Sequence, residues 1–415
     1  MNYIINSLVN LLSVDTERRT IRQTGGELLD QGGFGCVYSP AFYFDKNDKI
    51  MKHMDDSEQE YISKLTSIHD GEQEIEMNNK INKIDPKHIF TPRMVLSQQI
   101  SLDMLRTIET DESINACEST HQEMYNIVMD DAGTSILKII DIMNNNDSYY
   151  IDVINKLYKS FSNVVIGLDI MYSHNFIHMD IKTDNILFDF GGGDDNVKSN
   201  IIDFGVSIDL TDKIRNLQLE DYYMWSVENN VDPIEIIKQI HIKMTLPIEH
   251  VVYGLLFYDI NDPRIQSLDT NDELLYFIYN SFREGGVKLE ISDIASALRS
   301  IKDMLYYYSP IIQSVVHDRD DVTLVKFMPE FVELCRKIFM SIDAFCFGHV
   351  LSEIVEFDFE KLKDIERTKD EDDDDESIRE NSHNRIIKYK QIAEKLSCID
   401  MKHRISIHDV LDMFT

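Results

Sequence analysis

The stretch IHMDIKTDNILF, residues 177–188, combines an acidic, a basic and an amide side chain at short fixed intervals. Asp180 could accept a proton from an attacking hydroxyl group, Lys182 could neutralise a transferring anionic group, and Asn185 could hold a metal ion. Further along, the sequence IIDFG supplies Asp203, a second candidate metal ligand. Carboxylate and amide oxygens suit Mg²⁺. The two motifs in this order therefore indicate transfer of a phosphoryl group, which depends on positioning and charge neutralisation.

Glycines gather in the stretch DQGGFGCVY, between two segments that we expect to be extended. Backbone amides of such a turn could cover phosphates, so we expect Gly32, Gly33, Gly35 and the following Val37 to bind a nucleotide. A glycine-rich turn is weak evidence by itself, because hairpins also use glycine for positive φ.

A lysine on a neighbouring strand is needed to reach the same phosphates, and Lys52, after the letters KIM, is our prediction for it. Between Ser57 and Ile84 we expect one or two helices that stop at Asp85-Pro86. In that segment Glu74 has apolar residues three and seven positions later, which places it beside the buried face and able to orient Lys52. Glu76 is the alternative.

Taken together, these motifs resemble those of the eukaryotic protein kinase superfamily, from about Asp30 to the C-terminus. The resemblance implies an α+β, bilobal kinase fold with a small antiparallel-sheet N-lobe and a mainly helical C-lobe that carries a large helical insert. It implies ATP and Mg²⁺ as cofactors and Asp180, Lys182, Lys52 and Glu74 as catalytic residues, with Asn185 and Asp203 on the metal.

The same resemblance implies an adenine pocket. Met129 is similar to the gatekeeper residue, Asp130 to Ala132 to the hinge that bonds adenine through its backbone, and Leu187 to the residue under the adenine ring. Lys182, two residues after Asp180, is the pattern of serine/threonine kinases, so we expect protein substrates.

Later parts of the chain add to this resemblance. YYMWSVENN is similar to the end of an activation segment, and its Glu228 would pair with Arg404 of CIDMKHRIS. Asp343 in SIDAFCFGHVL would bond the backbone of the catalytic loop, and His178 would brace that loop as a packed histidine. Small-molecule phosphotransferases lack the pairing of this glutamate with this arginine.

Met179 is the main departure from the family pattern, because an arginine at that position usually pairs with a phosphorylated activation segment. We expect a kinase that is independent of such phosphorylation. Ile50 stands where a small residue usually lies over adenine, and Asp30 replaces the first loop glycine. A pseudokinase scaffold and a small-molecule phosphotransferase are the alternative functions.

The 415 residues carry a formal net charge of −33, which argues against binding to nucleic acid or to an anionic membrane surface. Basic protein partners fit better, and Asp184 favours basic residues in the substrate. The five cysteines, with no CxxC pair, predict neither a disulfide framework nor a zinc site, and so a cytoplasmic location. The sequence contains no run of 18 apolar residues, so we expect no membrane span. The sequence leaves the oligomeric state open.

We divide the chain into an N-terminal extension over residues 1–24, an N-lobe over 25–129 and a C-lobe over 130–415. The C-lobe holds an insert at about 229–340, for which a substrate surface and a mere covering of the lobe are equally good interpretations. It also holds an acidic loop at about 366–380. The helix ending in INKIDP and the Asn-, Ile- and Asp-rich composition resemble kinases of large cytoplasmic DNA viruses, which would place the chain in the host cytoplasm.

Overall fold

The structure is a computed structural model that describes most of the chain. The described residues are 27–32, 35–47, 49–53, 61–109, 114–115, 117, 121–144, 150–190, 197–211, 232, 234–235, 261–284, 289–312, 321–368 and 376–414. The predicted N-terminal extension, Gly33, Glu228 and residues 369–375 of the predicted acidic loop lie outside them. The chain forms two compact units. The first contains residues up to 171 and 183–207, and the second contains 172–182 and 208–413.

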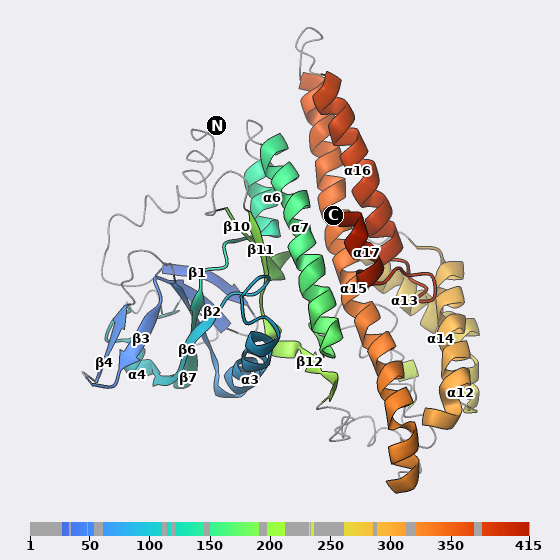
Figure 1. Cartoon of the computed structure of the whole chain (residues 1–415), viewed down its shortest axis with the longest axis horizontal. Coiled ribbons are helices and arrows are strands. Elements are labelled where there is room, and N and C mark those ends of the chain that lie inside the picture. The colour runs from blue at the N-terminus through green and yellow to red at the C-terminus, as the bar shows by residue number, and fades with distance from the viewer. Residues whose placement is uncertain are drawn as a thin grey trace. The chain divides into compact units, whose positions relative to one another are not determined.

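A five-stranded antiparallel sheet forms the centre of the first unit (Figure 1). Its strands, in spatial order, are β1 (Glu27–Gly32), β2 (Gly35–Ser39), β5 (Tyr61–Ser67), β7 (Glu123–Asp130) and β6 (Met94–Ser101). Directly opposed residues share a face of such a sheet, and so do residues two apart on one strand. Val37 opposes Lys64 and Ile62 opposes Met129, so these four side chains share one face.

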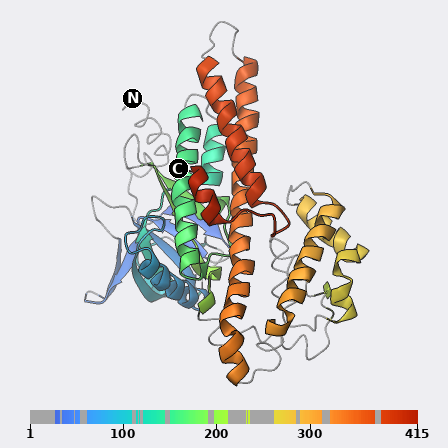
Figure 2. The same cartoon turned by 45° about the vertical axis from the view of Figure 1, so that its right-hand side comes forward.

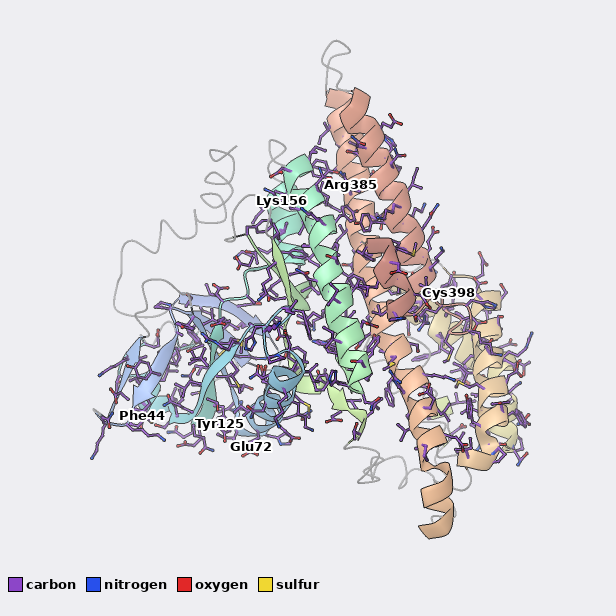
Figure 3. The ribbon with its side chains drawn as sticks, in the orientation of Figure 1. Phe44, Glu72, Tyr125, Lys156, Arg385 and Cys398 are labelled. Carbon is purple, nitrogen blue, oxygen red and sulfur yellow. A yellow bond between two sulfur atoms is a disulfide. The ribbon has the colours of Figure 1, made fainter. Side chains whose placement is uncertain are left out.

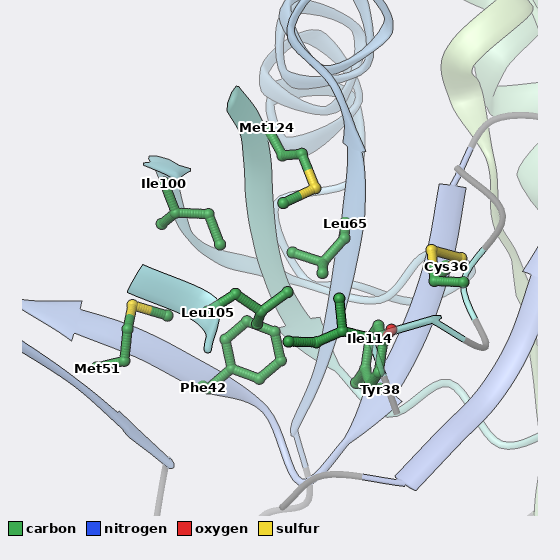
Figure 4. Close-up of a cluster of buried hydrophobic side chains, with 10 residues drawn as sticks. Cys36, Tyr38, Phe42, Met51, Leu65, Ile100, Leu105, Ile114 and Met124 are labelled. Atoms are coloured by element: carbon green, nitrogen blue, oxygen red, sulfur yellow. A yellow bond between two sulfur atoms is a disulfide. The ribbon is translucent and has the colours of Figure 1, made fainter. Parts of the chain in front are cut away.

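The opposite face of this sheet is buried under a second, smaller hairpin of β3 (Phe42–Asp45) and β4 (Ile50–His53) and the short helix α4 (Leu102–Leu105). Figure 4 shows the cluster of apolar side chains between these layers. Gln98 holds the hairpin in place, because its side-chain amide donates to the main-chain oxygen of Phe44 at 2.9 Å and accepts from its nitrogen at 2.7 Å.

A disulfide joins Cys36 of β2 to Cys117 within this cluster (Figure 4). Our prediction that the chain lacks disulfides is therefore wrong. The two cysteines are 81 residues apart in the sequence and have no recognisable spacing. The cytoplasmic location that we inferred from reduced cysteines loses that support and stays a prediction.

The helix α3 (Ile68–Ile84) follows β5 and packs on β7. Ser67 caps its first turn by accepting from the backbone N–H of Asp70, and it ends before Asp85-Pro86 as predicted. A Cβ at Gly71 would lie 2.7 Å from the ring of Tyr125, labelled in Figure 3, so a glycine is needed for this close approach. The prediction of helix from Ser57 onward is wrong, because residues 61–67 form β5.

The rest of the first unit contains a three-stranded sheet. Its strands are β8 (Thr134–Ser135), β10 (Ile186–Asp189) and β11 (Lys198–Ile201), with β10 in the middle. A long helix, α7 (Tyr150–Ser173), is preceded by α6 (Ile136–Asn144). Phe161 of α7 meets Phe188 of β10 edge to face, with 5.5 Å between ring centroids. The short helices η3 (Thr183–Asn185) and η4 (Phe204–Val206) flank this sheet in the sequence.

The second unit is mainly helical. Its elements are β9 (Phe176–Ile177), β12 (Ile208–Asp209), α12 (Pro263–Gln266), η5 (Leu268–Thr270), α13 (Asp272–Glu284), α14 (Ile291–Ile312), α15 (Asp321–Thr368), α16 (Glu376–Leu396) and α17 (Ile407–Phe414). In Figures 1 and 2, α15 and α16 run side by side. Arg385, labelled in Figure 3, binds the buried carboxylate of Asp358 through two nitrogens at 2.8 and 3.1 Å and so joins the two helices. This unit confirms the predicted helical character of the insert where it is described.

One stretch of α15 within the described residues, Pro329–Ile365, is long and apolar enough to cross a membrane by length and composition. Its most apolar window is 67% buried inside the protein, as expected for the core helix of a folded domain, which meets the same two criteria. We therefore interpret it as a core helix.

Candidate active site

The ammonium group of Lys64 is the centre of a cluster of charges on the first unit. Lys64 Nζ lies 2.9 Å from Oε2 of Glu74 on α3 and 3.0 Å from Oδ1 of Asp203, which directly precedes η4. The alternation of β5 directs Lys64 to the sheet face that α3 covers, away from the face buried under the hairpin. Strand, helix and loop thus bring together three residues that are far apart in the sequence.

Burial and charge oppose each other in this cluster. Burial alone would lower the pKa of Lys64, but the carboxylates of Glu74 and Asp203 outweigh it and raise that pKa above its usual value. Lys64 therefore stays a cation across the physiological pH range. Burial raises the pKa of Glu74, and the charge of Lys64 opposes this rise. A buried ion pair of this kind is weak evidence for stability and better evidence for a positioned charge.

Asp203 and Asn185 are placed together by the backbone. The main-chain N–H of Ile202 donates to the carbonyl oxygen of Asn185 at 3.0 Å, which fixes the residue before Asp203 beside Asn185. Asp203 adopts a left-handed conformation, with φ 64° and ψ 71°, which aspartate tolerates better than most residues. One carboxylate and one amide oxygen fit Mg²⁺, which takes few protein ligands and fills its shell with water and phosphate oxygens. No group of three His, Cys, Asp or Glu side chains suited to a metal occurs among the described residues.

The catalytic loop around Asp180 belongs to the second unit. Lys182 Nζ lies 2.7 Å from a carboxylate oxygen of Asp180, and the Lys182 side chain is 47% exposed, so it is accessible to a substrate. His178 is fully buried, and its Nδ1 accepts a hydrogen bond from the backbone N–H of Asp180 at 3.2 Å. This contact confirms His178 as a packed residue that braces the loop.

Asp343 of α15 holds the backbone of this loop, as predicted. Its two carboxylate oxygens accept from the N–H groups of His178 at 2.7 Å and Met179 at 2.8 Å. Burial raises the pKa of Asp343 to about 7, although the two N–H donors act in the opposite direction. Met179 has φ 71°, a strained conformation for a bulky side chain, and the two hydrogen bonds to Asp343 oppose its relaxation.

Comparison with known proteins bears on this geometry. Residues 24–226 match the family model for the protein kinase domain. These residues belong to the protein kinase superfamily. A search of curated proteins found no match. The cluster of Lys64, Glu74 and Asp203 lies within the matched residues, and so do Asp180 and Asn185.

The kinase strand lysine is Lys64, and our prediction of Lys52 is wrong. Lys52 lies on β4 of the inserted hairpin, where it opposes Tyr43 and forms an ion pair with Asp45 at 3.0 Å. In the sequence, this hairpin lies between the glycine-rich turn and β5. Its strand β4 therefore occupies the place where the family pattern predicts the strand that carries the lysine. The sequence signal that could have identified Lys64 is the alternation of YISKLTS, which is typical of a strand. Lys64 stands in the same alternating positions of that strand as other partly buried residues.

The change of lysine affects one of the two predictions linked to it. The residue two positions before Lys64 is Ile62, so Ile62 rather than Ile50 takes the place of the small residue over adenine. Ile62 lies on the same sheet face as Val37 and Met129, both predicted to contact the nucleotide. Glu74 keeps its predicted position beside the strand lysine, whereas the alternative, Glu76, is 62% exposed and pairs with Lys80.

The glycine-rich turn lies between β1 and β2, with Gly32 opposite Gly35. Gly35 has φ +144°, and a Cβ there would lie 2.1 Å from the carbonyl oxygen of Leu65, so the sheet requires glycine at this position. Asp30 is exposed and accepts from the N–H of Gln31 at 2.8 Å. Its charge is therefore solvated, which limits its repulsion of phosphates.

The kinase hinge follows β7, at the end of which Met129 is buried. Leu187 of β10 opposes Ser135 of β8 on one side and Asn200 of β11 on the other. Leu187 thus lies in the middle strand of the three-stranded sheet, and its position under the adenine ring stays a prediction.

Arg404 donates to the main-chain oxygens of Cys398 at 2.8 Å and Ser341 at 2.7 Å, and its guanidinium lies 4.7 Å from the ring centroid of Phe345. It thereby ties the loop before α17 to α15. Its predicted partner Glu228 lies outside the described residues, so that pairing stays a prediction.

Proposed function

We propose that this chain is an active, ATP- and Mg²⁺-dependent protein kinase that phosphorylates serine and threonine residues of proteins. The observation that carries this proposal is the position of Lys64, 2.9 Å from Glu74 and 3.0 Å from Asp203. Activity in this superfamily needs the strand lysine paired with the helix glutamate and the metal-binding aspartate in place at the same time.

In the proposed mechanism each residue has a separate role. Lys64 binds the phosphates of ATP, and Glu74 fixes the direction of its ammonium group. Asp180 accepts the proton of the substrate hydroxyl, and Lys182, 2.7 Å from it, neutralises the charge of the transferring phosphoryl group. Asn185 and Asp203 would hold Mg²⁺, which when bound neutralises charge on the phosphates.

Asp180 and Asn185 are five positions apart in the chain, which limits their separation to about 18 Å at full extension. The general base is thus joined to one proposed metal ligand by a short stretch of chain. The preference for serine and threonine is supported by Lys182, two residues after Asp180.

Met179 supports regulation without phosphorylation of the activation segment. Its side chain is buried, at 6% exposed, and offers no positive charge to a phosphate. Asp184 on η3 is exposed and supports a preference for basic residues in the substrate. A peptide library tests this preference: wild type should select Arg or Lys, and Asp184→Ala should lose that selection while keeping its activity on unselected peptides.

The test of the proposed function is incubation of the purified chain with Mg²⁺-ATP and a mixed pool of proteins and peptides, beside the Asp203→Asn variant. Metal-dependent phosphate on serine or threonine that disappears in the variant supports the kinase. Consumption of ATP without protein labelling indicates a small-molecule phosphotransferase, and absence of any transfer indicates a pseudokinase scaffold. Either of the last two results would overturn the proposal.

A further inference from the structure

A buried asparagine donates a hydrogen bond to the predicted hinge. Asn200 of β11 is 2% exposed, and its Nδ2 donates to the main-chain oxygen of Ala132 at 3.0 Å. Asn200 stands opposite Leu187, so the two side chains lie on the same face of the sheet. Nothing in the sequence pattern singles out Asn200, and the kinase mechanism above does not use it.

The peptide group between Ala132 and Gly133 is hydrogen-bonded at both of its ends. Its carbonyl oxygen accepts from Asn200, and its N–H, on Gly133, donates to Oδ1 of Asp131 at 2.9 Å. Gly133 has φ +99°, and a Cβ there would lie 2.2 Å from the carbonyl oxygen of Phe188. The backbone at Gly133 therefore lies directly against β10. The orientation of this peptide is therefore fixed by two side chains and by the sheet behind it.

This arrangement determines which backbone groups of Ala132 remain for a ligand. The carbonyl oxygen is engaged by Asn200, while the N–H of Ala132 forms no hydrogen bond within the described residues. A buried N–H without a partner is unfavourable, and a ring nitrogen of adenine is an acceptor that would satisfy it.

We infer that Asn200 is a positioning residue for the nucleotide, which holds the Ala132 carbonyl so that the hinge presents a single N–H donor to the base at this residue. The inference rests on the proposed function, because it takes ATP as the ligand. Asn200 hydrogen-bonds to the hinge and has no role in the proposed phosphate binding or proton transfer, so its contribution belongs to ATP affinity and not to the chemical step.

The chain contains a matched control for this role. Asn126 of β7 is also a buried asparagine of the first unit, and its Nδ2 donates to the main-chain oxygen of Phe42 at 2.7 Å. In both residues Oδ1 is buried without a hydrogen-bond partner among the described residues. Asn126 opposes Leu65, however, and so lies on the sheet face under the hairpin, opposite to the face of Val37 and Lys64.

The experiment compares wild type, Asn200→Ala and Asn126→Ala of the full chain. It measures the Kd of a non-hydrolysable ATP analogue, the KM for ATP, the kcat at saturating ATP and the melting temperature. We expect the Kd and KM of Asn200→Ala to rise about ten-fold, the ratio that corresponds to one neutral hydrogen bond, with kcat within about two-fold of wild type. Asn126→Ala should lose similar thermal stability and keep the wild-type Kd and KM.

Asn200→Asp provides a second variant of the same size, in which an ionised carboxylate cannot donate to Ala132; it should show the same rise in KM at pH 8. If wild type binds the analogue and Asn200→Ala binds it as tightly as Asn126→Ala does, the inference is overturned and the proposed function stands. If wild type itself does not bind the analogue, the proposed function fails and the inference fails with it. A fall in kcat without a rise in KM would also overturn the positioning role.

Discussion

The ammonium group of Lys64 lies 3.0 Å from a carboxylate oxygen of Asp203, although 139 residues separate them in the sequence. The contact joins the central strand of the five-stranded sheet to the loop that carries the metal ligand. It also identifies Lys64 of β5, and not the predicted Lys52, as the lysine beside Glu74. The first predictions concern the residues that hold this contact in place.

Glu74→Gln should lower kcat/KM by at least about ten-fold, because the amide keeps a hydrogen bond to Lys64 but removes the charge that fixes its direction. Burial already disfavours the ionised form of Glu74, so the variant should melt near the wild-type temperature. The matched control is Glu76→Gln, whose side chain is 62% exposed on the same helix. Steady-state kinetics check the prediction, and equal effects of the two variants would contradict it.

Asp343 should make stability depend on pH. Its pKa is about 7 in the folded state against 3.8 for an ordinary aspartate, so between these values the folded protein binds more protons than the unfolded chain. The free energy of unfolding should therefore fall as pH rises from about 4 to about 7, by up to about 1.4 kcal/mol per pH unit from this group. Above pH 7 its contribution becomes constant.

The measurement is chemical denaturation of wild type and Asp343→Asn over this pH range. The difference between the two slopes isolates Asp343, because the other titrating groups are common to both proteins. A wild-type slope that is equal to that of the variant, or more positive, would contradict the prediction. The variant should also lose kcat, because one amide oxygen cannot replace two carboxylate oxygens at His178 and Met179.

Reduction of the disulfide between Cys36 and Cys117 should destabilise the first unit. A cross-link between residues 81 apart restricts the unfolded chain by roughly 4 kcal/mol in the loop-entropy description. Dithiothreitol should lower the melting temperature of wild type but not of the variant with Cys36→Ala and Cys117→Ala. Cys398→Ser, at a free cysteine of the second unit, should respond to reductant as wild type does. If dithiothreitol left the wild-type melting temperature unchanged, that result would contradict the presence of the cross-link.

Activity should not depend on phosphate in the activation segment, because Met179 provides no charge to receive it. Treatment with a broad-specificity phosphatase should leave the initial rate unchanged. The variant with Ser207, Thr211, Tyr222 and Tyr223 replaced by Ala or Phe should keep activity within about three-fold of wild type. Loss of activity in a variant that keeps the wild-type melting temperature would contradict this prediction.

The sequence predicts best where chemistry itself fixes the spacing. Asp180, Lys182, Asn185 and Asp203 lie in two short motifs. The separation of these motifs is set by one loop and by the hairpin of β10 and β11. Asp343 could be predicted from the sequence for a similar reason, because its helix must place a carboxylate against the backbone of the catalytic loop.

The parts that could not be predicted depend on contacts between distant segments. Lys64 was missed because an inserted hairpin, with its own lysine, precedes the true strand. Cys36 and Cys117 meet only because the small hairpin and α4 cover one face of the sheet. Asn200 resembles any polar residue in a strand until the fold places it behind Ala132.

The central claim is that this chain transfers phosphate with Lys64 as its phosphate-binding lysine. The most direct measurement is the rate of radiolabelled phosphate transfer from ATP to protein by wild type, Lys64→Met and Lys52→Met. We predict that Lys64→Met loses at least about 100-fold in rate, since it removes a charge used in the transition state, and that Lys52→Met stays within about two-fold of wild type. Full activity in Lys64→Met, or its loss in Lys52→Met at unchanged melting temperature, would contradict the account.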